Sequence, residues 1–167
     1  HWCHLLGGKA GVLGTLGNGL FGQLQPCANT TGSAVEIQRE LARELSLGAD
    51  LVAMEVSSHG LVQHRVAALP FAVAAFTNLS RDHLDYHGSM EAYAAAKREL
   101  FSLLPSSDCV LNADDPVARQ WLAELPDAVV YSQQGLTFSY AGRFVAVERV
   151  EFHERGFSAS INSSWGM

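Results

Sequence analysis

Three apolar runs in this sequence each end in side chains that can bind metal ions or transfer protons. The runs span residues 51–54, 71–76 and 109–111, and the polar groups that follow them are Glu55 with 57–60, 77–83 and 112–115. Short continuous apolar runs are typical of strands covered on both faces of a parallel sheet. Because ligands bind beyond the carboxyl ends of such strands, we expect the three polar groups to share one site.

Glu55 directly follows four apolar residues, so we expect its carboxylate to lie partly buried near the edge of the sheet. A buried carboxylate needs a cation or another partner. A metal ion or a salt bridge to Arg65 or Arg81 would satisfy it, and the spacing does not favour either.

The stretch 82–87 is dense in groups that ligate metals, with Asp82, His83, Asp85 and His87 close together. The HExxH zinc signature is absent from the sequence. Carboxylates with a single histidine suit magnesium or manganese better than zinc. The alternative is an ordinary solvated polar loop.

Lys97 is the most informative single residue. A helix beginning near Ser89 would carry an apolar stripe of Met90, Tyr93, Leu100, Phe101 and Leu104, with Lys97 in its middle and Arg98 and Glu99 pointing away. A lysine there either extends its ammonium group to solvent or is buried and must be neutralised or paired. A neutral amine can add carbon dioxide and become a carbamate, which binds metal as a carboxylate does; both alternatives stay open.

The remaining pattern predicts an α/β protein in which strands alternate with helices. Ser33 and Glu36 form a capping box for a helix that ends before Gly48. Its expected buried face is Ala34, Ile37, Leu41 and Leu45. A second helix should run from about 89 to 104, and a third should start after Asp115-Pro116.

The end of the chain has a different pattern. Residues alternate over 144–152 and 157–161 around a turn at 154–156, which predicts a β-hairpin. We therefore expect one domain over 1–167, with a parallel-sheet part at 1–135 and a hairpin part at 136–167.

Composition excludes several classes of protein. The chain has 167 residues, is 48% hydrophobic and 17% charged, and carries a net charge of −6. This excludes a disordered tail or a coiled coil and argues against a nucleic-acid partner. Cys3, Cys27 and Cys109 are too sparse for a disulfide framework and indicate free thiols in a reducing cytoplasm. The uncharged stretch 10–35 holds six glycines and a proline, so we expect no insertion into a membrane.

Two apparent phosphate-binding motifs fail on their context. The stretch 17–22 has the spelling GxGxxG, but no helix pattern follows it, and Asn18-Gly19 is interpreted as a tight turn. Gly8-Lys9-Ala10 lacks the final Ser or Thr of a P-loop.

Five strings carry a resemblance to a known family. They are NTTGS (29–33), MEVSSHGL (54–61), QHR (63–65), TNLSRDHLDYH (77–87) and EAYAAAK (91–97). In this order they resemble the central domain of the Mur ligases, over essentially the whole chain. The fold implied is a P-loop-type α/β domain with a parallel sheet and a C-terminal antiparallel hairpin portion.

The resemblance implies an ATP-dependent ligase of cytoplasmic peptidoglycan assembly. In the family, ATP phosphorylates a substrate carboxylate and the amine of an amino acid displaces the phosphate, with magnesium ions neutralising the oxygens. The strings are most similar to those of a ligase that adds the third amino acid to UDP-N-acetylmuramoyl-L-alanyl-D-glutamate. In such ligases this amino acid is usually meso-diaminopimelate, the one expected here, or L-lysine, and the sequence does not decide between them.

Site residues follow from the matched strings. By resemblance, the substrate contacts are Asn29, Thr30, Thr31, Ser57, Gln63 and Arg65, and the magnesium ligands are Glu55 and His83. Lys97 matches the family's carbamylated lysine, the expected catalytic group and a further metal ligand, which agrees with its place on the apolar stripe. Asn78, Asp82 and Asn112 fall in family motifs without an assigned role.

The departures from the family pattern also predict something. The family's P-loop string should lie just before His1, and the domains that bind UDP and select the amino acid are not in this sequence. We therefore expect a truncated central domain that by itself neither hydrolyses ATP nor ligates. Two rivals are a hydrolase with one metal ion on Glu55, Asp82, His83 and His87, and a non-catalytic module that holds an anion near Thr30, Thr31 and Arg65.

Overall fold

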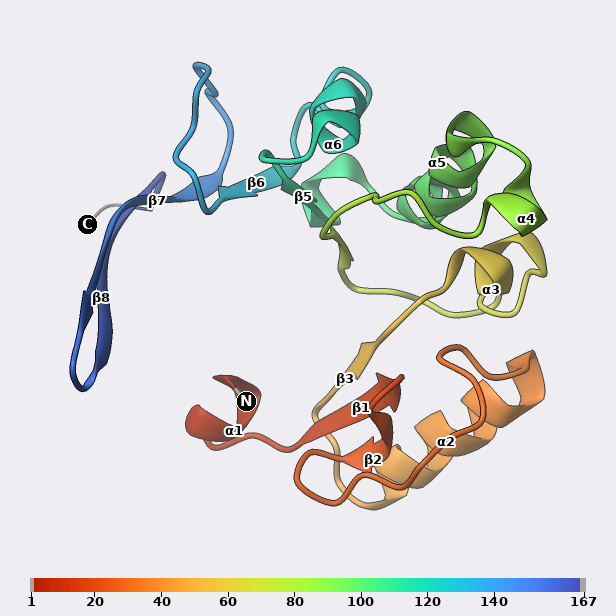
Figure 1. Cartoon of the computed structure of the whole chain (residues 1–167). Coiled ribbons are helices and arrows are strands. Elements are labelled where there is room, and N and C mark those ends of the chain that lie inside the picture. The colour runs from red at the N-terminus through yellow and green to blue at the C-terminus, as the bar shows by residue number, and fades with distance from the viewer. Residues whose placement is uncertain (1, 166–167) are drawn as a thin grey trace. The chain divides into compact units, whose positions relative to one another are not determined.

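The computed structural model describes residues 2–165 (Figure 1). The chain divides into two compact units, His1–Leu69 and Pro70–Met167. Both are mixed α/β, and each is built on a sheet that contains parallel strands. The predicted α/β class is confirmed.

The first unit is organised around a three-stranded sheet with the order β2-β1-β3. β1 (Ala10–Gly14) and β2 (Gly17–Leu20) form an antiparallel hairpin, and β3 (Leu51–Met54) runs parallel to β1. Gly14 pairs with Gly17, so the turn of the hairpin is Thr15-Leu16. The predicted turn at Asn18-Gly19 was wrong, because these residues lie inside β2 and pair with β1.

Three helices accompany this sheet: α1 (Trp2–Leu5), α2 (Ala34–Ser46) and α3 (Ser58–Val62). The predicted capping box of α2 is confirmed in both directions. The predicted buried face is only partly right, since Ile37 is buried but Leu45 is 72% exposed. Glu44 is the buried residue in that turn, with no exposed surface.

The second unit is built on a five-stranded sheet with the order β4-β5-β6-β7-β8. The first four strands are parallel neighbours: β4 (Ala74–Phe76), β5 (Cys109–Asn112), β6 (Val129–Ser132) and β7 (Phe144–His153). β8 (Gly156–Ser163) returns antiparallel to β7, as the predicted hairpin requires. The strand predicted at 71–76 is shorter than expected, because only its last three residues pair with β5.

Helices line this sheet: α4 (Leu84–His87), α5 (Met90–Arg98) and α6 (Pro116–Trp121), with short 3₁₀ turns at Glu99–Leu103 and Ser106–Asp108. The core joins Phe76 and Leu111 of the sheet to Phe101 and Trp121. Arg98 does not point away as predicted: its guanidinium lies over the Trp121 ring and pairs with Glu124 at 3.1 Å. The helical phase changes at Glu99, where the α-helix gives way to a 3₁₀ turn.

The polar groups after the three predicted strands were expected at one edge of one sheet, and this is confirmed for those after β4 and β5. β4 and β5 are parallel neighbours, so the polar residues after them lie side by side. β3 pairs with β1 in the other sheet, so the expectation of one sheet for all three was wrong. The sequence did not predict the β1–β2 hairpin, and β1 of this hairpin is the strand that pairs with β3.

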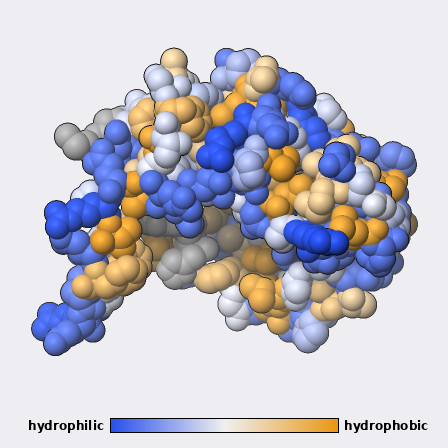
Figure 2. Space-filling model, turned by 45° about the horizontal axis from the view of Figure 1, so that its top comes forward, coloured by the Kyte–Doolittle hydropathy of each residue, from blue (hydrophilic) through white to orange (hydrophobic). Residues whose placement is uncertain are grey.

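Apolar side chains gather partway along the β7–β8 hairpin, while its turn at Glu154-Arg155 is hydrophilic (Figure 2). The three cysteines are free thiols, as predicted. Within residues 2–165, no helix combines the length and apolar character needed to cross a bilayer.

Candidate functional site

Glu55 leaves the end of β3 beside the turn of the β1–β2 hairpin. The backbone N–H of Thr15 donates a hydrogen bond of 2.6 Å to its Oε2. Its own N–H donates to the carbonyl of Leu13, which extends the pairing of β3 with β1 by one residue. The predicted partial burial of Glu55 was wrong, because the residue is exposed at the end of β3. Arg65 makes its hydrogen bonds to Gln63 and Thr31 and not to Glu55. Glu55 is thus held by a backbone amide, which leaves an exposed carboxylate that can approach a ligand.

Thr31 joins two of the family-like strings. Its hydroxyl donates to the Glu55 carbonyl at 3.0 Å and accepts from the Ser57 N–H at 2.8 Å. The residue is 1% exposed. These two hydrogen bonds fix the backbone on both sides of Val56, and so hold Glu55 and Ser57 in place.

Arg65 lies against the same loop. Its Nη1 donates to the Thr31 carbonyl at 2.7 Å, while Nε and Nη2 both donate to Oε1 of Gln63, at 2.9 Å and 2.5 Å. The Ser57 hydroxyl accepts from the Gly60 N–H and caps α3. The predicted group of Thr31, Ser57, Gln63 and Arg65 is therefore one connected network in the first unit.

Thr15 is a member of this region that the sequence reasoning missed. Besides holding Glu55, its hydroxyl is hydrogen-bonded to the Thr30 hydroxyl at 2.9 Å. Asn29 is exposed, and its carbonyl accepts a hydrogen bond from the Cys27 thiol. No sequence signal singled out Thr15, since it precedes the motif strings and only the hairpin turn brings it to Glu55.

His83 begins α4 in the second unit with an unusual backbone. Its φ of 53° and ψ of 26° place it in the left-handed region, which histidine visits more readily than most non-glycine residues. The Asp82 carboxylate accepts the His83 N–H at 2.8 Å and lies 3.6 Å from the imidazole Nδ1. At 3.6 Å the carboxylate lies beside Nδ1 but beyond hydrogen-bonding distance.

Lys97 lies one helical turn after Tyr93 on α5. Its Nζ lies over the Tyr93 ring, 5.2 Å from the ring centre, and the residue is half-buried. The prediction is confirmed for the turn from Tyr93 to Lys97, whereas Leu100, Phe101 and Leu104 lie beyond the end of α5. Burial, with a smaller contribution from the negative charge of Asp82, raises the pKa of the Tyr93 phenol.

The ends of β4 and β5 are joined by polar contacts that are mainly structural. Asn112 donates its side-chain N–H to the Thr77 carbonyl at 2.7 Å. Asp115 caps α6 through the amides of Val117 and Ala118, and accepts the Leu79 N–H at 2.8 Å. These contacts hold the loop after β4 in place, directly before Asp82.

In the described part of the chain, no three His, Cys, Asp or Glu side chains gather as a metal site built from those residue types alone requires. Asp82, His83 and His87 therefore do not form the cluster that the hydrolase alternative needs. A metal site that includes an oxygen ligand from a modified lysine would need fewer His, Cys, Asp or Glu side chains, and this finding does not exclude it.

Comparison with known proteins gives a consistent picture. The family model described as Mur ligase middle domain matches residues 1–166. A UDP-N-acetylmuramoyl-L-alanyl-D-glutamate–2,6-diaminopimelate ligase of Haemophilus influenzae is 52% identical over 165 residues, which are 99% of this chain and 34% of that protein. A solved structure of a ligase of the same name matches with a TM-score of 0.79 and 32% identity, over 98% of this chain and 33% of that one. The chain thus spans about a third of the length of these relatives.

Proposed function

Since this chain belongs to the Mur ligase family, whose middle domain it matches over residues 1–166, we propose that it serves an ATP-dependent amide-bond ligase. The proposed reaction adds meso-diaminopimelate to UDP-N-acetylmuramoyl-L-alanyl-D-glutamate during peptidoglycan synthesis in the cytoplasm. The observation that carries this proposal is the 52% identity to a 2,6-diaminopimelate ligase across 99% of the chain.

The first unit is proposed to contact the UDP-sugar dipeptide. Arg65 is held by Gln63 and by the Thr31 carbonyl, which supports a cation presented in a fixed direction to a carboxylate or phosphate. Thr30 and Asn29 lie partly or fully exposed on the same loop and can donate polar contacts. Thr31 is buried, so its proposed contribution is to hold Ser57 and Glu55 in place.

Magnesium fits the donors that the chain offers. Glu55 supplies a carboxylate in the first unit, and in the second His83 supplies an imidazole backed by Asp82. Magnesium prefers oxygen ligands such as the Glu55 carboxylate, and an imidazole is a less common ligand of this cation. When bound, magnesium and ATP would supply charge neutralisation and the phosphoryl group that activates the substrate carboxylate.

Lys97 is proposed to be carbamylated. In this step the neutral Nζ attacks carbon dioxide, an N–C bond forms, one C–O electron pair moves onto oxygen, and Nζ loses a proton to water. The product exchanges a cation for an anionic oxygen ligand. Lys97 is half-buried, and the Tyr93 ring over which its Nζ lies also contacts the His83 ring.

The test is carbon-13 NMR of the full-length protein supplied with ¹³C-labelled bicarbonate. A carbamate signal that disappears in Lys97→Ala is expected, together with loss of ligation that a small carboxylate such as formate partly restores. Lys9→Ala is a control for a lysine outside the proposed site, whose Nζ bonds the Leu47 carbonyl.

Normal ligation by Lys97→Ala would overturn the carbamate role. Metal-dependent hydrolysis of simple phosphoesters without ligation would favour the hydrolase. Binding of the UDP-linked dipeptide without any turnover would favour the non-catalytic module.

A further inference from the structure

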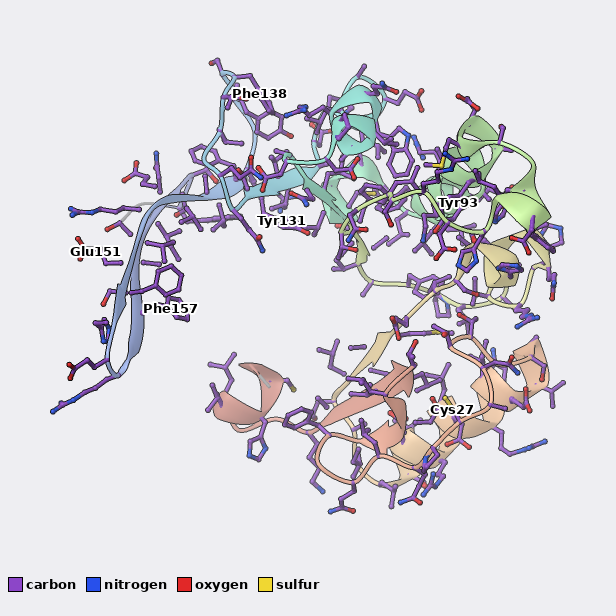
Figure 3. The ribbon with its side chains drawn as sticks, in the orientation of Figure 1. Cys27, Tyr93, Tyr131, Phe138, Glu151 and Phe157 are labelled. Atoms are coloured by element: carbon purple, nitrogen blue, oxygen red, sulfur yellow. The ribbon has the colours of Figure 1, made fainter. Side chains whose placement is uncertain are left out.

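Tyr93 is the centre of an aromatic cluster that the proposed function has not used. The residue is 6% exposed and lies on α5 where α5 packs against α4 (Figure 3). Three neighbours contact its ring: His83, His87 and Lys97. Two of them are proposed ligands of magnesium.

Each contact has a defined geometry. The His83 ring stands almost perpendicular to the Tyr93 ring, at 84° with the centres 5.8 Å apart. The His87 ring stacks on it at 20° and 5.0 Å. The Lys97 Nζ lies 5.2 Å from the ring centre, which is within the range of a cation–π contact for the unmodified, charged lysine. Perpendicular and stacked ring pairs are the favoured arrangements of aromatic groups.

His83 needs such support. Its backbone is in the left-handed region at the start of a four-residue helix, and its side chain is substantially exposed. The Asp82 carboxylate accepts the His83 N–H and lies 3.6 Å from Nδ1, so it acts more directly on the backbone than on the ring. The buried Tyr93 ring adds a wall on one side of the imidazole, which limits its rotation.

We propose that Tyr93 is a positioning residue that sets the orientation of the His83 imidazole, with the His87 ring as its support. This inference rests on the proposed function, in which His83 and Lys97 serve magnesium. The Tyr93 ring contacts all three neighbours. Tyr93→Phe should therefore preserve the role, and Tyr93→Leu should remove it.

The experiment uses the full-length protein with ¹³C-labelled histidine rings and Mn²⁺ as a paramagnetic probe. The His83 and His87 signals are assigned with His83→Gln and His87→Gln. In Tyr93→Leu, both signals should move because the ring current of Tyr93 is lost. The Mn²⁺ concentration that half-broadens the His83 signal should rise by about tenfold, the size of a lost aromatic contact of this kind.

Phe101→Leu is the matched control. Phe101 is as buried as Tyr93 but contacts Phe76 and Trp121. The substitution should therefore lower the stability of the protein without changing the His83 signal or the Mn²⁺ affinity. His87→Leu is a milder variant at a half-buried position and should weaken Mn²⁺ binding less than Tyr93→Leu. If Tyr93→Leu does not fold, His87→Leu still tests whether the aromatic cluster positions His83.

Two kinds of failure are distinguishable. Unchanged His83 signals and Mn²⁺ affinity in Tyr93→Leu and His87→Leu, or an affinity lost equally in Tyr93→Phe and Phe101→Leu, would overturn the positioning role. A wild-type protein with no Lys97 carbamate and no Mn²⁺ effect on His83 would instead overturn the proposed function on which this role rests.

Discussion

Gly14 and Glu55 face each other so closely that any larger residue at position 14 would force the Glu55 side chain to move. A Cβ on Gly14 would lie 2.5 Å from Oε2 and 2.9 Å from Cβ of Glu55. The end of β1 is therefore shaped to receive the Glu55 side chain, while the next residue, Thr15, supplies the amide that binds it.

Gly14→Ala should displace Glu55 and destabilise the protein by about 1–3 kcal/mol, the usual cost of an overpacked site. Magnesium-dependent activity should fall with it, because the carboxylate loses its place against Thr15. Urea unfolding and the magnesium dependence of ligation measure the two effects. The stability cost should shrink in a Glu55→Gly background, where the clashing atoms are gone; strictly additive costs would contradict the close approach.

Thr31→Val should cost about 2 kcal/mol, because it leaves the Ser57 N–H and the Glu55 carbonyl without their buried partner. Thr31→Ser keeps the hydroxyl and should cost about half as much or less. Chemical unfolding of the two variants gives the comparison. Equal stability of both would mean that the hydroxyl does not hold the loop.

The stability of the first unit should depend on the protonation of Glu44. Burial, and to a lesser degree Glu40, raises the pKa of Glu44 from 4.5 to about 7, while the Gly19 amide and Arg43 oppose the shift. Neither carboxylate oxygen has a hydrogen bond of normal geometry within the described residues. The folded state therefore favours the neutral acid.

The sign follows from proton binding. Between pH 4.5 and about 7 the folded state holds a proton on Glu44 that the unfolded chain has lost, so the free energy of unfolding falls as pH rises. The full loss is at most about 3–4 kcal/mol. Glu44→Gln should lack this decline when unfolding is followed from pH 4 to 8. Glu40→Gln, on the same helix, should keep most of it; a parallel decline in Glu44→Gln would refute the assignment.

Asp115 should be the most costly cap in the second unit. Its two oxygens accept from three backbone amides, those of Leu79, Val117 and Ala118. Asp115→Ala should cost about 2–4 kcal/mol, and Asp115→Asn less, since the amide oxygen can still cap α6. Ser89→Ala, which removes the single capping bond of α5, is the comparison at about 1 kcal/mol. Thermal unfolding that ranks Ser89→Ala as the more damaging change would contradict this account.

Local signals made part of the fold predictable. The pair Ser33 and Glu36 and the pair Asp115-Pro116 each specify a helix start by chemistry within a few residues, and both starts are confirmed. The phase of Lys97 on α5 was equally readable, because Tyr93 lies one turn before it.

The missed features depend on distant partners. Gly11 and Gly14 disfavour a strand by propensity, yet β1 needs them because Glu44 and Glu55 approach its backbone. The same approach buries Glu44 in place of Leu45, which an apolar pattern cannot reveal. The connection of Thr15 to Glu55 is likewise made only when β1 pairs with β3. The roles assigned to the site residues remain predictions.

The register shift between Val147 and Arg149 divides β7 into two parts that can open separately. Before it, β7 is bonded on both sides, to β6 and to β8; beyond it, the two hairpin strands have only each other. The outer amides can exchange their hydrogens in an opening that leaves the parallel strands intact. We therefore expect two levels of protection from amide hydrogen exchange along β7, with the boundary at the register shift.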